Sequence, residues 1–253
     1  KNAGELERQD YSFPIYEAVK TFELPKEWVL TLKQYCAEKG IIFFSSICDE
    51  EQADFYDRLG VPIFKTTSYA ITHLPLIEHI AKKGKPIIMS TGGATLKEIH
   101  EAYATARKFT DKIILLHCFI KYPAPLGEIN MNVVETLREE FPEVVIGYSD
   151  HTAEPTVAPV AAIAKGAKVI EKHITLDKNM EGPDHFFALN PEELKEMVSA
   201  VRGAEEKIKL GEEIEVNPVV FGSAEKKINA EEQYLRNFAY QTIFTSAAIK
   251  KGE

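Results

Sequence analysis

Two histidines, each following an apolar run, are the residues of this sequence with the clearest chemical potential. The run 144–148 is followed closely by His151, and the run 167–170 is followed closely by His173. One alanine-rich helical segment separates the runs, so they should be neighbouring parallel strands whose carboxyl ends meet at one edge. Neutral imidazole is a common ligand for Mn, Zn, Fe and Co. The pattern predicts a shared divalent metal, with two hydrogen-bonded core histidines as the alternative.

Lys65, at the end of another predicted strand, could contribute the positive charge of an anion site. Burying its ammonium group is costly unless the group faces an anion or an opposite charge. Neighbouring strand ends carry hydroxyl donors that suit a phosphate, namely Ser46, Ser68 and Ser90. The segment Ser90–Gly93 precedes a predicted helix, so its N–H groups could also cradle an anion. The alternative for this segment is a turn with a helix cap.

Three further residues could face the same edge of the sheet, and each also has a purely structural reading. Lys172 could bind phosphate, or it could form an ion pair with Glu171 or Asp150. Asp184 could bring a carboxylate near the metal, or it could be a turn residue. Tyr122 opens a long loop and could form a wall for a polyhydroxylated substrate, or it could belong to a rigid turn.

Short apolar runs alternate with amphipathic helical segments along the chain. The runs are almost continuously hydrophobic, which is typical of strands buried on both faces of a parallel sheet. Asn190 before Pro191 predicts a capped helix start. Strands are expected at 41–44, 62–64, 86–89, 113–116, 144–148 and 169–170, and helices at 26–38, 50–59, 74–83, 95–107, 131–140, 155–165 and 191–208.

Every predicted strand ends in polar residues, which favours one shared functional face. In a TIM (β/α)8 barrel, the active site lies at the carboxyl ends of the strands. A doubly wound open sheet is the alternative, but no GxGxxG sequence follows the first strand. A barrel needs eight strands and six are predicted; two strands before Lys1 would explain the difference.

Composition allows one large domain and excludes several partner classes. The chain has 253 residues, of which 45% are hydrophobic and 27% charged. Its net charge is −9 with lysines and arginines scattered among acids, so no nucleic-acid footprint is expected. No apolar run is long enough for a membrane span, and no secretory signal is recognisable. The three cysteines have no CxxC spacing, which favours a reduced, cytoplasmic setting.

An ordered set of motifs resembles the sialic acid synthase (N-acetylneuraminate synthase) family from about Ile15 to Glu253. These enzymes condense phosphoenolpyruvate with an N-acetylated sugar. Two stretches, Tyr69–Pro75 and Arg236–Tyr240, look most like the spore-coat polysaccharide branch of that family. The motifs are Lys65–Ser68, Met89–Gly92, Leu116–Cys118, Tyr122–Pro125, Gly147–His151, Glu171–His173 and Gly182–His185.

The resemblance implies a TIM barrel followed by a small antifreeze-like domain. Residues 1–208 would be the barrel without its N-terminal strands, 209–235 a linker, and 236–253 the start of the antifreeze-like domain. It also implies a homodimer in which the small domain of one subunit covers the barrel mouth of the other.

The resemblance also implies roles for individual residues. His151 and His173 would hold Mn²⁺, with Mg²⁺ or Co²⁺ as alternatives, and would act in catalysis with Lys65. C3 of phosphoenolpyruvate would attack the aldehyde of a sugar such as N-acetylmannosamine, water would add at C2, and phosphate would leave with C–O cleavage. Phosphoenolpyruvate would be bound by Lys65, Ser46, Ser68, Ser90 and Ser149, and the sugar by Tyr122, Asp184 and Phe238.

The sequence departs from the family pattern in three ways. Ala70 stands where the family usually has a glutamate. A glutamate of the first strand and a lysine of the second would lie before Lys1, and a cross-subunit arginine beyond Glu253. The 253 residues alone are therefore expected to be inactive and poorly stable, because an open barrel exposes two strand edges.

Two other functions remain open at this point. One is a different metal-dependent barrel enzyme, such as a sugar-phosphate aldolase that releases no phosphate. The other, motivated by Ala70, is a non-catalytic relative that binds sugar or scaffolds polysaccharide assembly.

Overall fold

The computed structural model describes residues 5–8, 11–14, 20–21, 23–240, 247 and 249–250. Within them, six parallel strands form one sheet in the order β3-β4-β5-β6-β7-β8, so each strand pairs with its neighbour in sequence. The strands are β3 (Ser46–Ile47), β4 (Phe64–Thr66), β5 (Ile87–Ser90), β6 (Ile113–Cys118), β7 (Val145–Asp150) and β8 (Ile170–Lys172).

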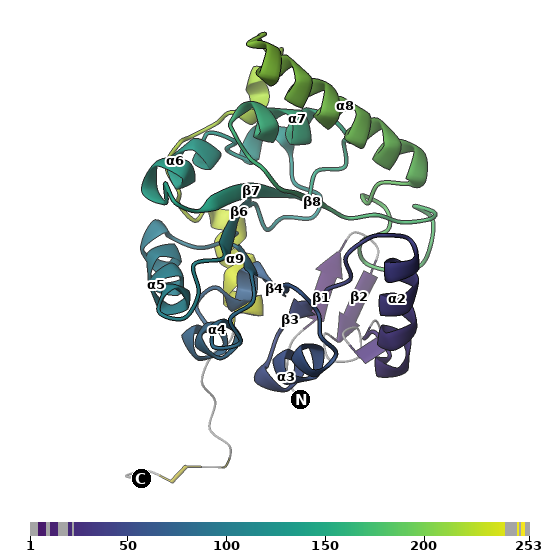
Figure 1. Ribbon diagram of the computed structural model, residues 1–253, viewed down its shortest axis with the longest axis vertical. Helices are drawn as coiled ribbons and strands as arrows, with labels where there is room; N and C mark the ends of the chain where they lie inside the picture. The colour runs from purple at the N-terminus through teal and green to yellow at the C-terminus, as the bar shows by residue number, and fades with distance from the viewer. Residues whose placement is uncertain are drawn as a thin grey trace.

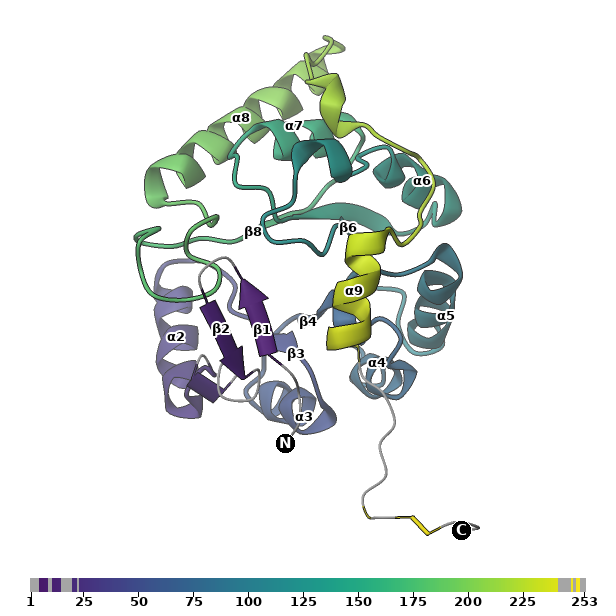
Figure 2. The ribbon, with the colours of Figure 1, turned by 180° about the vertical axis from the view of Figure 1, so that it is seen from behind.

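Helices surround the strands as an outer layer (Figure 1). They are α2 (Lys26–Glu38), α3 (Glu50–Arg58), α4 (Leu74–Ala81), α5 (Leu96–Arg107), α6 (Val133–Glu140), α7 (Val157–Ala164) and α8 (Pro191–Leu210). A further helix, α9 (Ala230–Ala239), lies inside this ring, in front of the strands in Figure 2. Short 3₁₀ turns lie at η1 (Ser68–Ala70), η2 (Leu126–Glu128) and η3 (Pro218–Val220). Alternation of parallel strands with helices matches the predicted βα units.

The sheet is curved like the wall of a barrel. Lys65 on β4 and Glu171 on β8 lie four strand positions apart in the sheet, yet their Nζ and Oε2 atoms are 3.5 Å apart. In a flat sheet, four steps between strands would separate these backbones by about 19 Å. The strands therefore form most of a TIM-barrel wall, as the sequence predicts.

Helix ends follow the signals in the sequence. Asn190 caps α8: its side chain accepts from the N–H of Glu193, and the Glu193 carboxylate accepts from the N–H of Asn190. This reciprocal capping box satisfies N–H groups that the first helical turn leaves unpaired. At the other end, Gly211 has φ 71°, the left-handed conformation that glycine adopts without a steric penalty.

The first predicted strand, 41–44, is wrong. The strand of this segment is β3, which begins at Ser46, and residues 41–45 form no ladder. Ile41 and Ile42 remain 61% and 62% exposed. Among the described residues, the outer edge of β3 has no neighbouring strand, so an apolar run there has no ladder to join, and only Phe43 packs against the core.

Two elements were not predicted. A hairpin of β1 (Glu5–Arg8) and β2 (Tyr11–Pro14) lies beside β3 and α2 (Figures 1 and 2). Helix α9 crosses the boundary predicted at residue 235, between linker and antifreeze-like domain. Beyond residue 240, the predicted start of that domain lies outside the described residues except at 247, 249 and 250, so the domain division stays a prediction.

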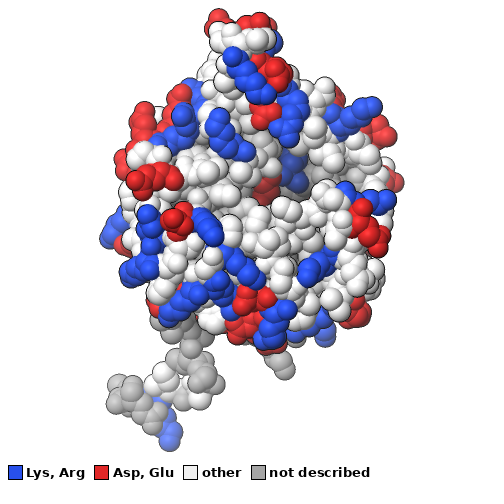
Figure 3. All heavy atoms as spheres, viewed as in Figure 1, with Lys and Arg blue, Asp and Glu red and all other residues white. Residues whose placement is uncertain are grey.

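Surface charges of both signs are mixed. On the face seen in Figure 3, lysines and arginines are interspersed with aspartates and glutamates. On α8, for example, Arg202 pairs with Glu205 and Lys209 with Glu206. No helix in the described part of the chain is both long and apolar enough to cross a bilayer.

Two glycine substitutions should shift stability in opposite directions. A β-carbon at Gly147 on β7 would come within 2.5 Å of the Val169 carbonyl oxygen and 2.6 Å of a Leu116 methyl group. Gly147→Ala should therefore lower the free energy of unfolding by about 2 kcal/mol. Gly203→Ala, in the middle of α8 with no atom within 4 Å of the new methyl group, should raise it by roughly 0.5–1 kcal/mol. Urea unfolding measures both, and equal effects would contradict the packing argument.

Candidate active site

The two histidines singled out by the sequence lie next to each other. Asp150 and Lys172 are register partners at the ends of β7 and β8, so the residues that follow them are also side by side. The ring centroids of His151 and His173 are 5.3 Å apart. The predicted juxtaposition is therefore present, and the metal itself stays a prediction.

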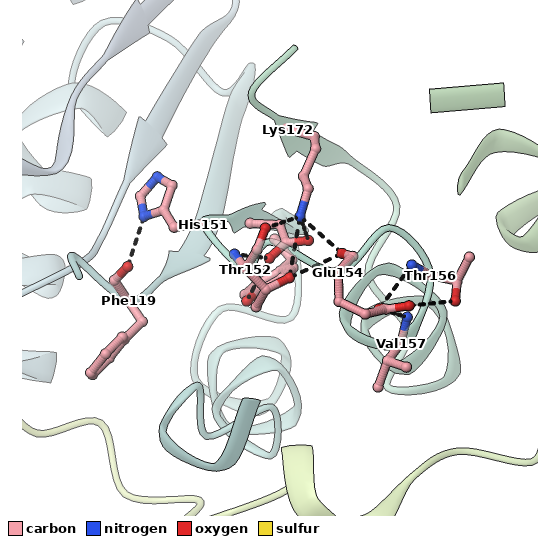
Figure 4. A network of polar contacts seen from close by, with 9 residues as sticks. Phe119, His151, Thr152, Glu154, Thr156, Val157 and Lys172 are labelled. Carbon is pink, nitrogen blue, oxygen red and sulfur yellow. Dashed lines mark hydrogen bonds and ion pairs between the residues drawn. The ribbon is translucent and has the colours of Figure 1, made fainter. Parts of the chain in front are cut away.

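Both imidazoles favour the neutral form that binds metals, and His151 has a fixed tautomer. His151 Nδ1 lies 2.7 Å from the carbonyl oxygen of Phe119 (Figure 4). A carbonyl only accepts, so Nδ1 carries the hydrogen and Nε2 keeps its lone pair. Burial lowers the pKa of His151, and burial together with the nearby His151 lowers the pKa of His173 to about 4. Neutral rings with one fixed tautomer suit a transition metal.

Other ligands near the pair are few. The Asp184 carboxylate lies 3.7 Å from His173 Nδ1, so it is close to the predicted metal position. Within the described residues, no group of three or more histidine, cysteine or carboxylate side chains is arranged to hold a metal ion. The pair fits a metal as two nitrogen ligands, with the other coordination positions left for oxygen donors.

Aromatic rings pack around the histidines. The centroid of Tyr122 lies 4.1 Å from that of His151 and 6.0 Å from that of His173. Phe187 packs against His173 at 5.0 Å and against Tyr122 at 5.9 Å. These rings limit access of water to the imidazoles, and they put Tyr122 where the sequence predicted a wall of the site.

Lys65 lies at the centre of a polar cluster in the barrel interior. It is only 4% exposed, and its Nζ donates to Ser90 Oγ and to the Thr66 carbonyl, both at 2.8 Å. Its ion-pair partner is Glu171, whose other carboxylate oxygen accepts from Ser149 Oγ at 2.6 Å. The cluster thus joins β4, β5, β7 and β8, and holds a cation that the sequence predicted to face an anion or an opposite charge.

The remaining predicted hydroxyl residues, Ser46 and Ser68, are on β3 and just after β4. Ser68 Oγ accepts from the Gly92 N–H at 3.0 Å and lies 3.5 Å from Cys118 Sγ. Ser46 is exposed on β3, where it is the register partner of Lys65. The backbone of Phe238 lies in α9, and its side chain is outside the described residues, so its predicted contact with the sugar stays a prediction.

The sequence left two roles open for Lys172, phosphate binding and an ion pair, and the structure shows the ion pair. Its Nζ donates to Asp150 Oδ2 at 2.6 Å, to the Thr152 carbonyl at 2.5 Å and to the Glu154 carbonyl at 3.2 Å (Figure 4). Its side chain is 2% exposed and that of Asp150 is fully buried. An ammonium group has three hydrogens, so Lys172 has none left for a phosphate.

Glu171 is the site residue that the sequence analysis missed. Register puts Ser149 opposite Glu171 and opposite Cys118, so the three side chains form one row across β6, β7 and β8. A signal was available: alternate residues of a strand share a face, and Glu171 is two residues before His173. An ionisable side chain on the predicted ligand face should have been included.

Comparison with known proteins identifies the family. Residues 1–213 match the NeuB family. The spore coat polysaccharide biosynthesis protein SpsE of Bacillus subtilis is 48% identical over 240 residues, 94% of this chain and 64% of that protein.

The chain belongs to the NeuB family.

Other NeuB relatives carry the names of synthases. The N,N'-diacetyllegionaminic acid synthase of Legionella pneumophila is 37% identical over 94% of this chain and 64% of its own length. The human N-acetylneuraminate-9-phosphate synthase is 38% identical over 68% of this chain and 47% of its own length. This NeuB chain thus spans less than two thirds of the relatives it matches.

Solved structures agree with the barrel. The crystal structure of SpsE from Bacillus subtilis superposes with a TM-score of 0.87 and covers 95% of this chain and 68% of that one. A truncated 3-deoxy-D-arabino-heptulosonate 7-phosphate synthase from Thermotoga maritima, 18% identical, has a TM-score of 0.63. At that identity the likeness concerns the fold alone.

Replacing Glu171 by Gln should tighten the binding of inorganic phosphate near Lys65. The substitution keeps the bond to Ser149 but removes a negative charge 3.5 Å from the ammonium group. We expect the Kd for phosphate, measured by titration calorimetry, to fall by about threefold to tenfold. Glu101→Gln, which changes an exposed pair with Lys97 on α5, is the control and should leave the Kd unchanged. An unchanged Kd in Glu171→Gln would mean that phosphate does not bind beside Lys65.

Proposed function

We propose that the protein to which this chain belongs condenses phosphoenolpyruvate with an N-acetylated hexosamine and releases phosphate. The product would be a nonulosonic acid of the sialic acid type, for a surface or spore-coat polysaccharide. The observation that carries the proposal is the proximity of two sites at one barrel face: the buried Lys65 cluster and the pair of neutral histidines. The names of the relatives as synthases support the same reaction class.

The Lys65 cluster has the properties of a site for phosphoenolpyruvate. The cation is buried, and hydroxyl groups of Ser90, Ser149 and Ser68 lie at the ends of neighbouring strands or directly after them. Hydrogen bonds to an ionised ligand are stronger than those between neutral groups, especially where water is excluded. Lys65 would hold the negative charge that moves onto the leaving phosphate.

The histidine pair would hold the metal at the end of the site where the aldehyde group of the sugar binds. His151 and His173 would hold Mn²⁺, Mg²⁺ or Co²⁺, and the bound metal would supply a Lewis acid for the carbonyl oxygen. Tyr122 lies against both imidazoles and Asp184 beside His173, so both are placed to contact a polyhydroxylated substrate. Two nitrogen ligands favour Mn²⁺ or Co²⁺ over Mg²⁺.

The proposed condensation balances with water as the only additional reactant. C3 of phosphoenolpyruvate forms a bond to the aldehyde carbon, which becomes an alcohol carbon. Water adds at C2, and its two protons end on the new alcohol oxygen and on the phosphate. The C2–O bond to phosphate breaks, so phosphate leaves as an anion and C2 becomes a ketone. Glu171, bonded to Ser149 and paired with Lys65, is the carboxylate in the cluster that can accept the proton of that water.

Ala70 bears on the choice of sugar. It is the last residue of η1, two residues after Ser68, and is 5% exposed. The resemblance places a glutamate at this position in most of the family, so the acceptor of this protein would be bound without that carboxylate. From the resemblance, we propose an N-acetylmannosamine-like sugar as the class of acceptor. Cytoplasmic location and a homodimer remain part of the proposal.

Phosphate release tests the proposed reaction. The complete protein, incubated with Mn²⁺, phosphoenolpyruvate and a panel of N-acetylated hexosamines, should release phosphate only when a suitable sugar is present. His151→Ala should lower the rate by at least about 100-fold, as expected when a metal ligand is lost. His100→Ala, which changes a surface histidine paired with Glu140, should leave the rate unchanged. A folded, metal-loaded protein that releases no phosphate with any sugar would favour the binding or scaffold function instead.

The affinity for Mn²⁺ should depend only weakly on pH. The pKa of His173 is lowered to about 4 and that of His151 is also lowered, so both rings stay neutral to a lower pH than an ordinary histidine does. Between pH 7.5 and 6.0, the affinity should fall by less than about twofold, whereas two histidines with the ordinary pKa near 6.5 would lose roughly tenfold. Calorimetric titration of the complete protein measures this, with His151→Ala as the variant that should lose binding. A tenfold loss would show that the imidazoles titrate near the ordinary pKa.

A further inference from the structure

Helix α9 holds the loop that follows β5, which we call the β5 loop (Thr91–Ala94). The Gly93 N–H donates to Glu232 Oε1 at 3.0 Å, and the Gly93 carbonyl accepts from Arg236 Nη1 at 2.9 Å. Both polar groups of one glycine are thus bonded to side chains one helical turn apart on α9. This contact is at the carboxyl ends of the strands, where α9 lies in front of the sheet in Figure 2.

The adjacent glycine is held in the same way. The carbonyl of Gly92 accepts from the hydroxyl of Tyr240 at 3.0 Å, and its N–H donates to Ser68 Oγ at 3.0 Å. A β-carbon at Gly92 would clash with Ile120, Cys118 and Ser68. The loop therefore needs glycines, and since glycine is the most flexible residue, its conformation has to be fixed from outside.

Glu232 is the centre of this arrangement. Its side chain is buried, with the residue 3% exposed. Besides the Gly93 N–H, Oε1 faces the N–H of Ile120 at 3.4 Å, and Oε2 faces the N–H of Asn229 in the capping box of α9. One carboxylate thus joins the β5 loop, the loop after β6 and the start of α9.

Lys226 is a buried cation whose charge is felt by this carboxylate. Burial lowers the pKa of Lys226, and the Glu232 carboxylate opposes that shift. A second charge contact fixes the other end: Arg236 forms a two-pronged ion pair with Glu98 on α5, and this bond lowers the pKa of Glu98 to about 2. The connection between α9 and the barrel is therefore polar, buried and bonded at several points.

The β5 loop adjoins residues of the candidate site, and the loop after β6 carries one. Ser90, the hydrogen-bond partner of Lys65, is the last residue of β5, and Gly92 orients Ser68. Ile120 is two residues before Tyr122, whose ring lies against His151. A shift of the Glu232 carboxylate would therefore move two parts of the site together: the hydroxyl groups near Lys65, and Tyr122, which packs against His151.

We propose that Glu232 is a positioning residue for phosphoenolpyruvate binding, acting through the backbone of Gly93 and Ile120, with Arg236 and Tyr240 in support. This inference rests on the proposed function and adds to it a residue on a helix outside the barrel. Glu232 would contact neither phosphoenolpyruvate nor the histidine pair; it would set the position of Ser68, Ser90 and Tyr122 through the two loops.

The test uses the complete protein and a matched control. Glu232 and Glu193 are each the third residue of a helix and each completes a capping box with an asparagine. The other oxygen of Glu193 bonds Lys178, far from the two loops in sequence. Glu193→Ala therefore removes the same helix cap without removing the loop contacts, and separates a general loss of stability from a loss of positioning.

Glu232→Ala should raise both the KM for phosphoenolpyruvate and its calorimetric Kd by about tenfold, with a smaller change in kcat. Glu232→Gln keeps one acceptor oxygen for the Gly93 N–H and should restore most of the affinity. Glu193→Ala should leave both constants unchanged, whatever its effect on the melting temperature. Equal constants in Glu232→Ala and Glu193→Ala would overturn the proposal.

A milder variant keeps the proposal testable if Glu232→Ala does not fold. Tyr240→Phe removes one hydroxyl, the donor to Gly92, and should raise the Kd for phosphoenolpyruvate by about threefold. A Kd equal to that of the wild type would count against the proposal. Failure of the proposed function is distinct from both results, because then the wild-type protein itself would neither bind phosphoenolpyruvate nor release phosphate.

Discussion

The buried ion pair between Asp150 and Lys172 fixes the geometry on which the candidate site depends. It joins the carboxyl ends of β7 and β8 at the register position just before His151 and His173. Breaking such a pair by removing one partner typically costs about 3–5 kcal/mol, because the remaining charge stays buried. The pair adds little to net stability by itself, but it holds the two strand ends at one height, and this brings the imidazoles within 5.3 Å of each other.

Two buried lysines of this barrel illustrate how similar groups come to serve different purposes. The ammonium group of Lys172 is bonded to a fully buried carboxylate and to backbone carbonyls, none of which can move away. Lys65 is paired with Glu171, whose side chain is 38% exposed, and with the hydroxyl of Ser90. These partners can rearrange when an anion arrives. The two lysine side chains are alike. Their partners therefore decide that Lys172 has a structural role and that Lys65 can bind an anion.

The site is assembled from elements far apart in the sequence. Six strands contribute residues at their carboxyl ends, and α9 returns from the end of the described chain to bond the loop after β5. The backbone groups of Gly92 and Gly93 are satisfied by side chains instead of by a ladder. Buried backbone groups need partners, so a loop of this kind depends on the segment that supplies them. Fixing such a loop is a general requirement for an anion site, where donors must point to one place before the ligand binds.

The sequence by itself determined the order of strands and helices, the barrel class, the histidine pair and the burial of Lys65. These follow from local signals: continuous apolar runs, helix caps such as Asn190, and polar residues where each run stops. It could not show that the first apolar run, 41–44, lies outside the sheet. A strand forms only beside another strand, and the residues of the run do not reveal whether one is present. It left the role of Lys172 open and missed both Glu171 and α9. Only tertiary structure decides these. Curvature of the sheet brings β4 and β8 together, and the Glu232 carboxylate accepts from the N–H groups of Gly93 and Ile120, more than a hundred residues away in the sequence.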